Sequence, residues 1–281
     1  MPGHPVQVWW ARLSDARPGL LALLDPVERR RYEATVDRAG RERFLVGCAL
    51  SRLALGELLG LPPADVPLRR VCPRCGGPHG KVRLDLPQGG WPLGGPDLDF
   101  SVSHSGALIG VAVCENGRVG LDVEDVDVAV DVDSAARVAL ADSELVALHA
   151  RPPGARKSAF LRTWTRKEAV LKAFGVGLGA PLRDLVLSDP GQPPEVLGRP
   201  EQLDGRTGLR LTDLLVDEIH PAAVAVAAAA AVGPPGTAGT AEIPGTAGTA
   251  GTPGNPGTAG VQEAVDGLRI TLRDGSAALA G

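Results

Sequence analysis

The sequence predicts an α+β fold, and three of its features support that prediction. A segment with helical spacing of its apolar residues comes early, two β-branched apolar runs follow near the middle, and further helices then precede more strands. This order differs from the regular alternation of strand and helix in a parallel α/β sheet. With 281 residues, the chain is long enough for one large domain or for two smaller ones that each bury a core.

The N-terminal part is expected to contain one strand and two helices. Residues 6–10 are a strand candidate, and residues 26–59 carry apolar side chains mostly at helical spacing. Residues 61–96 are rich in Pro and Gly, so we expect mostly loop there.

A β-hairpin is predicted for ALIGVAVCENGRVGLDVE, residues 107–124. Its two apolar runs flank Asn116-Gly117, a dipeptide that supplies the positive φ values of a tight hairpin turn.

Helices and then strands are expected after this hairpin. Asp133 is predicted to cap a helix that runs to about residue 140, and a second helix begins near residue 142. A third helix is predicted over residues 158–174, with its end at Gly175. The remaining strand candidates are residues 182–187, 209–216 and 222–230.

The C-terminal part repeats short motifs of Gly, Thr, Ala and Pro, for example GTAGTAGT at residues 245–252. Such a sequence buries too little apolar surface to offset its ordering entropy, so residues 233–281 are expected to form a disordered tail. Its last piece, VQEAVDGLRITLRDGSAALAG, could form a small strand or a docking segment.

Charge and cysteine content exclude several classes of protein. A net charge of −4 gives no global attraction to nucleic acid or to an anionic membrane. No stretch approaches the ~18 consecutive apolar residues of a membrane span, and the N-terminus lacks a charged region followed by an apolar run, so a soluble cytoplasmic protein is expected. The 4 cysteines do not resemble a secreted disulfide framework and are expected to be reduced.

Two carboxylates stand on one face of the predicted strand VGLDVE. Asp122 and Glu124 are two residues apart, so both project to the same side. Adjacent carboxylates repel unless a cation separates them, and Mg²⁺ is the hard ion that carboxylates, waters and substrate phosphates usually hold. The alternative is a solvated polar face at a strand end.

The helix WTRKEAVLKAFG, residues 164–175, places three chemically distinct side chains on one face. Trp164, Glu168 and Lys172 follow one another at i, i+4 and i+8. The tryptophan turns that face toward packed structure, where a charge must pair or serve a ligand. The alternative is a Glu168–Lys172 ion pair on the surface, worth ~0.3–0.5 kcal/mol.

Two further stretches offer polar groups. In FSVSHSG, residues 100–106, Ser103, His104 and Ser105 could donate to phosphate oxygens. A Ser-His hydrolase is disfavoured because strand neighbours point apart. CPRCGGPHGK, residues 72–81, contains three possible zinc ligands and a lysine beside Gly80. These four residues are Cys72, Cys75, His79 and Lys81.

Taken in order, SVSHSG, GLDVE and WTRKEAVLK resemble the surfactin-synthetase type of 4′-phosphopantetheinyl transferases. That family has a G-[IV]-D-[IVL]-E strand and a W-[ST]-x-K-E-[AS]-x-x-K helix, and the resemblance covers roughly residues 5–230. It implies two similar α+β halves related by a pseudo-twofold axis, here residues 1–118 and 119–232, with coenzyme A and Mg²⁺ in the cleft between them.

The implied activity is transfer of the 4′-phosphopantetheine arm of coenzyme A to a serine of an apo acyl or peptidyl carrier protein. Polyketide, nonribosomal peptide or fatty acid synthases are activated in this way, and a cytoplasmic monomer is expected. The alternative is a non-catalytic relative that binds coenzyme A or a carrier protein. A zinc-stabilised nucleic-acid module is disfavoured by the acidic balance and by the scarcity of aromatic residues, 3% of the chain.

The resemblance also implies roles for individual residues. Asp122, Glu124 and Glu168 correspond to the metal ligands, and Glu168 to the base that takes the serine proton. The remaining positions correspond to residues that contact the phosphates or the nucleotide of coenzyme A, and they are Arg31, Lys81, Ser103, His104, Lys167 and Lys172, with Arg43 as a weaker candidate. Gly80-Lys81-Val82 departs from the family's Gly-Lys-Pro.

Overall fold

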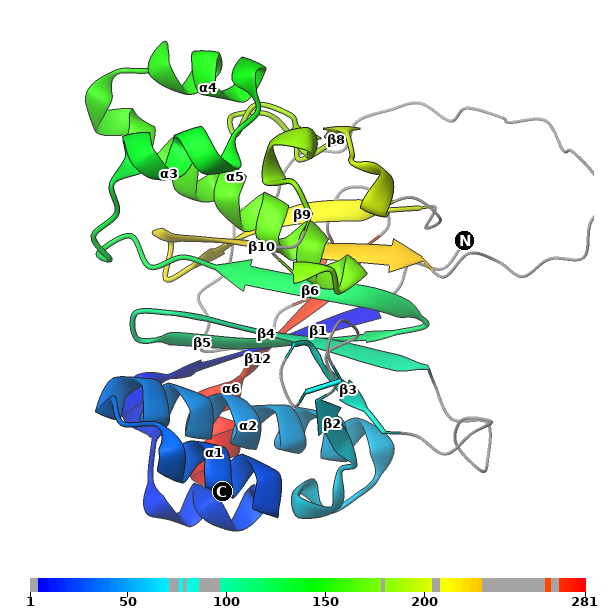
Figure 1. Cartoon of the computed structure of the whole chain (residues 1–281). Coiled ribbons are helices and arrows are strands. Elements are labelled where there is room, and N and C mark those ends of the chain that lie inside the picture. The colour runs from blue at the N-terminus through cyan, green and yellow to red at the C-terminus, as the bar shows by residue number, and fades with distance from the viewer. Residues whose placement is uncertain are drawn as a thin grey trace, which may run out of the picture.

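The structure is a computed structural model, and it describes residues 5–70, 76–77, 80–85, 97–177, 180–203, 208–228, 261–263 and 268–281. Its helices and strands confirm the predicted α+β class. Figure 1 shows the strands in the middle of the molecule, with helices on both sides. Among the described residues, no helix is long and apolar enough to cross a membrane.

The first sheet has five strands in the order β11-β12-β1-β5-β4. Strand β1 runs antiparallel to β5 and parallel to β12, and a short turn at Gly106 joins β4 to β5. Gly106 has a φ of 54°, the left-handed value that glycine adopts without strain. The bounds are β11 (Val261–Glu263), β12 (Arg269–Asp274), β1 (Pro5–Arg12), β5 (Leu108–Glu115) and β4 (Leu98–Ser105).

The second sheet has three antiparallel strands in the order β6-β10-β9. Two strand predictions in the C-terminal part are therefore confirmed, with small shifts at their ends. The bounds are β6 (Gly117–Val123), β10 (His220–Ala228) and β9 (Arg210–Val216).

The hairpin predicted for residues 107–124 is wrong, because β5 and β6 belong to different sheets. Asn116 has a φ of 57°, but Gly117 does not adopt a positive φ, whereas the predicted hairpin turn needs both. The chain turns at Asn116 and β6 leaves the first sheet to pair with β10.

The other edge of β6 is held by side chains of β4 rather than by its backbone. Alternate residues of β4 point to one side, and their oxygens accept hydrogen bonds from alternate backbone N–H groups of β6 at 2.8, 3.0 and 3.3 Å. We call these contacts the β4 side-chain ladder. Its pairs, acceptor first, are Asp99 with Val119, Ser101 with Leu121 and Ser103 with Val123.

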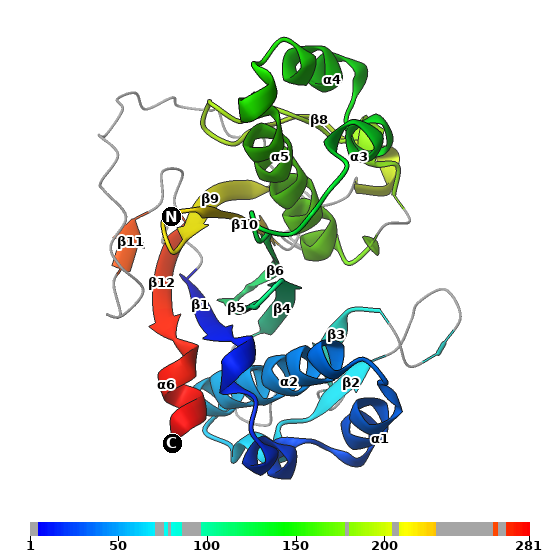
Figure 2. The ribbon, with the colours of Figure 1, turned by 90° about the vertical axis from the view of Figure 1, so that its left-hand side faces the viewer.

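Each sheet is covered by one long helix, α2 on the first and α5 on the second (Figure 2). Both helices are 22 residues long and end at a glycine in the left-handed conformation, Gly60 and Gly175. The predicted end of the third helix is thus confirmed, but the helix begins earlier, with Pro153 in its first turn. The bounds are α1 (Pro26–Ala34), α2 (Arg38–Leu59), α3 (Val132–Ala139), α4 (Asp142–His149), α5 (Pro153–Phe174) and α6 (Gly275–Ala280).

Helix α3 begins slightly before its predicted cap. The side chain of Asp131, not Asp133, accepts the hydrogen bond from Ser134 N at 3.2 Å. An acceptor at the N-cap reaches an N–H group two or three residues further on, and Asp131 stands at that distance from Ser134.

Short elements complete the described fold. Within residues 61–96, β2 and β3 form a two-stranded sheet, and the strand predicted at 182–187 is reduced to β7, because residues 182–184 form a 3₁₀ turn. The bounds are β2 (Leu68–Arg70), β3 (Val82–Leu84), β7 (Val186–Leu187) and β8 (Val196–Gly198).

The end of the chain corrects the expectation of one disordered tail over residues 233–281. Strand β12 pairs with β1, and α6 packs on α2 (Figure 2). Ile270 is fully buried between the two sheets, and Leu279 joins the core under α2. The reason is the apolar alternation of LRITL, which the repeats before it lack, and which agrees with the strand considered for this last piece.

Helix α5 lies so close to β6 that position 120 must be glycine. A Cβ atom at Gly120 would fall on the carbonyl oxygen of Ala169 and on the backbone nitrogen of Ala173. We predict that Gly120→Ala lowers the free energy of unfolding by ~1–3 kcal/mol, because helix and strand must move apart. Gly154→Ala, in the first turn of the same helix with nothing within 4 Å, is the matched control and is expected to be neutral or slightly stabilising. Urea unfolding measures both, and equal effects would contradict the close packing.

Candidate functional site

Four charged side chains predicted to act together converge where α5 crosses β6. Asp122 lies in β6 and Glu124 directly after it, while Glu168 and Lys172 lie one turn apart on α5. Together with Ser103 of β4 they form what we call the acid–lysine cluster. Trp164, one turn before Glu168, packs near Phe160 with ring centroids 6.0 Å apart and fixes the rotation of α5.

Lys172 pairs with Asp122 and not with Glu168. Its Nζ atom donates to Asp122 Oδ1 at 2.6 Å, to Ser103 Oγ at 3.0 Å and to the carbonyl of Leu121 at 3.1 Å. A surface ion pair along the helix is therefore not what holds this lysine. It links α5 to both β4 and β6.

Two serines of β4 donate hydrogen bonds to the carboxylates at the end of β6. Ser103 Oγ donates to Asp122 Oδ1 at 2.9 Å, and Ser105 Oγ donates to Glu124 Oε2 at 2.8 Å. Ser103 is buried and uses its hydroxyl fully, since it also accepts from Val123 N and Lys172. Its direct role is thus to position Asp122 and Lys172.

Two carboxylate oxygens of the acid–lysine cluster are buried without a hydrogen-bond partner, Asp122 Oδ2 and Glu168 Oε1. Burial raises the pKa of both acids, and the charge of Asp122 raises the pKa of Glu168 further, while Lys172 opposes the rise in each case. The pKa of Glu124 is also raised, mainly by burial. Buried oxygens with no partner are unfavourable unless a cation or proton satisfies them.

These oxygens fit a hard cation in chemistry. In the described part of the chain, however, no three His, Cys, Asp or Glu side chains converge as a ready metal-binding group. In the present arrangement Lys172 and Ser105 each take one carboxylate oxygen, from Asp122 and Glu124 respectively. Asp122, Glu124 and Glu168 are hence the residues that could hold a metal ion once their free oxygens turn toward it.

A basic cavity of about 350 Å³ lies on the other face of β4, against α2. His104 lines it because strand alternation turns His104 away from Ser103. Apolar side chains such as Phe44 and Phe100 form part of its wall. The arginine and histidine side chains that line it are Arg31, Arg43, Arg70 and His104, with Glu28 as the acidic member.

The arginines of this cavity differ in how their charge is compensated, since Arg43 pairs with Asp37 at 3.8 Å. Arg31 makes no ion pair among the described residues and stacks over the Phe44 ring, 5.1 Å from its centroid. Burial and then the charge of Arg31 lower the pKa of Arg70. Burial, Arg43 and Lys172 lower the pKa of His104, which favours the neutral imidazole near pH 7. The arginines suit this cavity to phosphate groups, and the aromatic side chains in its wall suit it to a flat ring of the same ligand.

Arg70 is missing from the predicted site residues. It lies in β2, within the stretch predicted to be loop, and its side chain reaches the basic cavity through the short β2-β3 pairing. Leu68 and Arg70 are two residues apart and would share one face of a strand. This spacing could have indicated a strand with an arginine facing an anion site.

Lys81 is not brought together with the other predicted residues. Its Nζ atom donates to the carboxylate of Asp99, to the carbonyl of Val119 at 2.9 Å and to the carbonyl of Lys172 at 3.3 Å. Asp99 is the first member of the β4 side-chain ladder, at the opposite end from Ser103. In this structure, Lys81 stabilises the start of β6 and is not free to bind a phosphate.

The prediction for Lys167 needs correction, since its side chain points away from the acid–lysine cluster. Lys167 is fully buried, and Nζ donates to Glu144 Oε2 at 2.6 Å and to the carbonyls of Ala139 and Leu182 at 2.9 and 3.0 Å. All three of its donors are used, so it joins α5 to the α3-α4 region.

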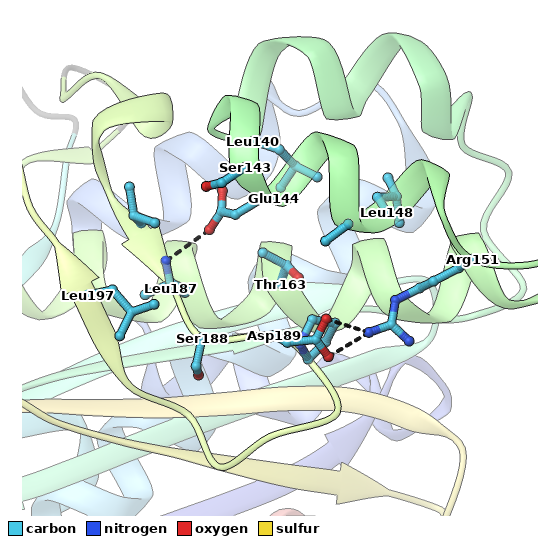
Figure 3. A pocket seen from close by; sticks show the side chains of 13 residues that line it. Leu140, Ser143, Glu144, Leu148, Arg151, Thr163, Leu187, Ser188, Asp189 and Leu197 are labelled. Carbon is cyan, nitrogen blue, oxygen red and sulfur yellow. Dashed lines mark hydrogen bonds and ion pairs between the residues drawn. The ribbon is translucent and has the colours of Figure 1, made fainter.

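Glu144, the partner of Lys167, also accepts from Leu187 N beside a cavity of about 200 Å³ (Figure 3). Figure 3 shows the Arg151–Asp189 ion pair at the same cavity. No residue of the acid–lysine cluster or of the basic cavity lines it. This part of the structure therefore supports α5 and is separate from the candidate site.

The remaining candidate ligands give no zinc site to describe. Cys72, Cys75 and His79 lie outside the described residues. Cys48 and Cys114 are buried free thiols, and burial raises the pKa of Cys114 to about 12. Burial also raises the pKa of Cys48, so the protonated thiol is favoured at both positions at neutral pH.

Residues 118–226 match the model of the 4′-phosphopantetheinyl transferase superfamily. The chain is 31% identical to 4′-phosphopantetheinyl transferase HetI of Nostoc sp. over 193 residues, which cover 66% of this chain and 71% of that protein. The chain belongs to the 4′-phosphopantetheinyl transferase superfamily. The resemblance indicated by the three motifs is thereby confirmed.

Two further transferases of this superfamily match shorter parts. The 4′-phosphopantetheinyl transferase AcpT of Salmonella typhi is 36% identical over 81 residues, 29% of this chain and 42% of that protein. The 4′-phosphopantetheinyl transferase gsp of Aneurinibacillus migulanus is 27% identical over 140 residues, 50% of this chain and 51% of that protein. Transfer of 4′-phosphopantetheine to carrier proteins is accordingly the activity of this chain's family.

The stretch matched by the superfamily model contains the charged residues on β6 and α5 but not the residues of the basic cavity. Asp122, Glu124, Glu168 and Lys172 all fall within residues 118–226. The residues of the basic cavity lie before residue 118. The four charged residues of the acid–lysine cluster thus lie within the stretch that the superfamily model matches, whereas Ser103 lies before it.

The two lysines of the α5 helix that lie outside the acid–lysine cluster are expected to differ in their effect on stability. We predict that Lys167→Met lowers the free energy of unfolding by ~3–5 kcal/mol, because it leaves the buried carboxylate of Glu144 without its cation. Lys157→Met, on the same helix, removes only a partly exposed amine bound to the carbonyls of Val126 and Val128 and should cost ~1 kcal/mol or less. Denaturant unfolding of both variants is the measurement. A Lys167→Met protein as stable as the control would refute the assignment of Lys167 to the core.

Proposed function

We propose that this protein transfers the 4′-phosphopantetheine group of coenzyme A to a serine of an apo acyl or peptidyl carrier protein. One observation carries the proposal: β4 has the acid–lysine cluster on one face and the basic cavity on the other. Adjacent residues, Ser103 and His104, belong to the two faces. A substrate with phosphates at two places, such as coenzyme A, could meet both groups at once.

The proposed metal is Mg²⁺, held by Asp122, Glu124 and Glu168. The unpartnered oxygens Asp122 Oδ2 and Glu168 Oε1 support this assignment, since carboxylate oxygens are the protein ligands of this ion. When bound, the ion would neutralise charge that develops on the diphosphate.

Lys172 is proposed to contact the diphosphate from the side opposite the free carboxylate oxygens. Its side chain is about one quarter exposed, at 27%, and its amine already lies among polar partners from two strands. Phosphoryl-type transfer depends chiefly on positioning and on neutralising charge, which a fixed ammonium group provides.

Glu168 is proposed as the base. A carboxylate within hydrogen-bond reach of a hydroxyl can accept its proton, and Glu168 has two carboxylate oxygens, so that one can hold the metal ion while the other takes the proton. The carrier serine gives its proton to Glu168, its oxygen bonds to the phosphorus that carries the pantetheine arm, and the bond from that phosphorus to the bridging oxygen breaks. The leaving group is adenosine 3′,5′-bisphosphate.

The basic cavity is proposed to bind the nucleotide end of coenzyme A. Arg31 and His104, both expected from the motifs, line it together with Arg43 and Arg70. A bound phosphate dianion favours the protonated imidazole, so binding would raise the pKa that Arg43 and Lys172 now lower.

We further propose that the chain is a monomer of two halves related by a pseudo-twofold axis. In support, α2 and α5 have equal lengths of 22 residues and end at left-handed glycines. Each covers a sheet that contains three successive antiparallel strands, β1-β5-β4 under α2 and β6-β10-β9 under α5. One chain already contributes both faces of the proposed site. The alternative, a non-catalytic binding protein, is favoured only by Lys81, which lies with Asp99.

The proposed activity predicts a covalent change in the carrier protein. Incubation with apo carrier protein, coenzyme A and Mg²⁺ should raise the intact mass of the carrier by one phosphopantetheine group, and omission of coenzyme A should abolish the change. Chelation of the metal should reduce the rate at least ~100-fold, because charge on the diphosphate is then not neutralised. If no carrier gains mass at any enzyme concentration while coenzyme A still binds by calorimetry, the non-catalytic alternative is correct.

Glu168→Gln tests the carboxylate itself, because glutamine keeps the size and removes the charge. Transfer should fall at least ~100-fold, and Mg²⁺ alone should no longer raise the thermal unfolding midpoint. Glu195→Gln, in the β7-β8 segment and away from the acid–lysine cluster, is the matched control and should keep both properties. Circular dichroism verifies the fold. Wild-type transfer by the Glu168→Gln variant would refute both roles assigned to this residue.

A further inference from the structure

Strand β12 and helix α6, at the end of the chain, pack together on elements formed by the first 59 residues. Strand β12 pairs with β1 in parallel from Pro5↔Arg269 to Trp10↔Asp274, and α6 lies on α2 and on the turn after β1 (Figure 2). Residues 229–267 separate this unit from the end of β10, and β11 within them pairs with β12.

Side chains of this unit fit specific partners on both sides of the first sheet. Ile270 is fully buried in the core between the sheets, while Leu279 is 2% exposed under α2. Arg273 lies over the ring of Trp9, 4.5 Å from its centroid, and its guanidinium pairs with Glu57 at 2.5 Å. The contacts combine backbone pairing, alternate apolar side chains and one charged pair, as in recognition by strand addition.

Polar contacts fix where the strand ends and the helix begins. The side chain of Asp274 accepts from Ala277 N at 3.0 Å and caps α6, and Ser276 donates to Asp15 at 2.6 Å. Gly275 stands against the backbone of β1, because a Cβ atom there would lie 2.6 Å from the carbonyl oxygen of Trp10 and 2.9 Å from Leu50. These contacts therefore fix the register of β12 on β1 and require glycine at position 275.

We propose that the edge of β1 together with α2 is a peptide-docking surface, and that its occupant is the segment 268–281 of the same chain, bound as a separable tethered ligand. The recognised pattern is an extended stretch with apolar residues at alternate positions, then Arg-Asp-Gly and one helical turn with a buried leucine. The tether keeps the segment at an effective concentration in the millimolar range, so it outcompetes free peptide by ~100-fold or more. This property is independent of the proposed transferase activity.

The test uses the full chain with a protease recognition sequence in place of residues 245–252. After folding, the protein is cleaved and mixed with an excess of a fluorescent peptide of residues 261–281. The cleaved protein is expected to release its own fragment and take up the peptide, whereas the uncleaved protein takes up at least ~100-fold less. Fluorescence anisotropy measures uptake, and mass spectrometry after gel filtration measures release.

Two peptide variants distinguish specific docking from non-specific binding of the peptide. The Gly275→Ala peptide should fail to exchange because of the clash with Trp10, and the Gly281→Ala peptide, with nothing within 4 Å, should exchange like wild type. Equal uptake of both variants would overturn the proposal. So would a fragment that is not displaced by any excess of peptide, or a protein that unfolds as soon as it is cut, since either result makes the segment an inseparable part of the fold.

Discussion

The β4 side-chain ladder is the constraint on which the site depends. Strand β6 has a backbone neighbour, β10, on one edge, and on its other edge oxygens of Asp99, Ser101 and Ser103 accept its N–H groups. Without these acceptors, each buried N–H group would cost ~1–3 kcal/mol. The ladder lets β4 and β6 belong to different sheets and still keep a fixed register. Its last member, Ser103, is where Asp122 and Lys172 meet, so the contacts that join the sheets also position the acid–lysine cluster.

Strand alternation on β4 then separates two kinds of chemistry. Ser103 faces β6 and its carboxylates, while His104 faces α2 and the basic cavity. The backbone of β4 separates the two faces, yet the charges of Lys172 and Asp122 still affect the pKa of His104. A ligand that reached both faces of β4 would therefore meet carboxylates and Lys172 on one face and arginines on the other.

The sequence predicted the elements well where a local rule decides them, and poorly where a distant partner does. Gly175 ends α5 as expected, since a left-handed glycine needs only its own helix. Asn116-Gly117 did not form its hairpin, because the choice of neighbour for β6 depends on β10, about 100 residues later. Lys167 was misassigned for a similar reason: it lies ~100° around the helix from Glu168, and only the position of Glu144 decides which side is buried. The apolar alternation of LRITL allowed a strand or docking segment at the end of the chain, but it did not identify β1 as the partner of that strand.

Asp122 explains how a lysine and a cation can share one carboxylate in the proposed site. Oδ1 accepts from Lys172 and Ser103 at 2.6 and 2.9 Å, whereas Oδ2 is buried and unpartnered. Two cations on one oxygen would repel strongly, but on opposite oxygens both are attracted by the same charge. Burial raises the pKa of Asp122, and Lys172 counteracts that rise. In the proposed site Lys172 would therefore support cation binding without touching the cation, because an unpaired acid at this depth would take up a proton and lose the charge that attracts the metal.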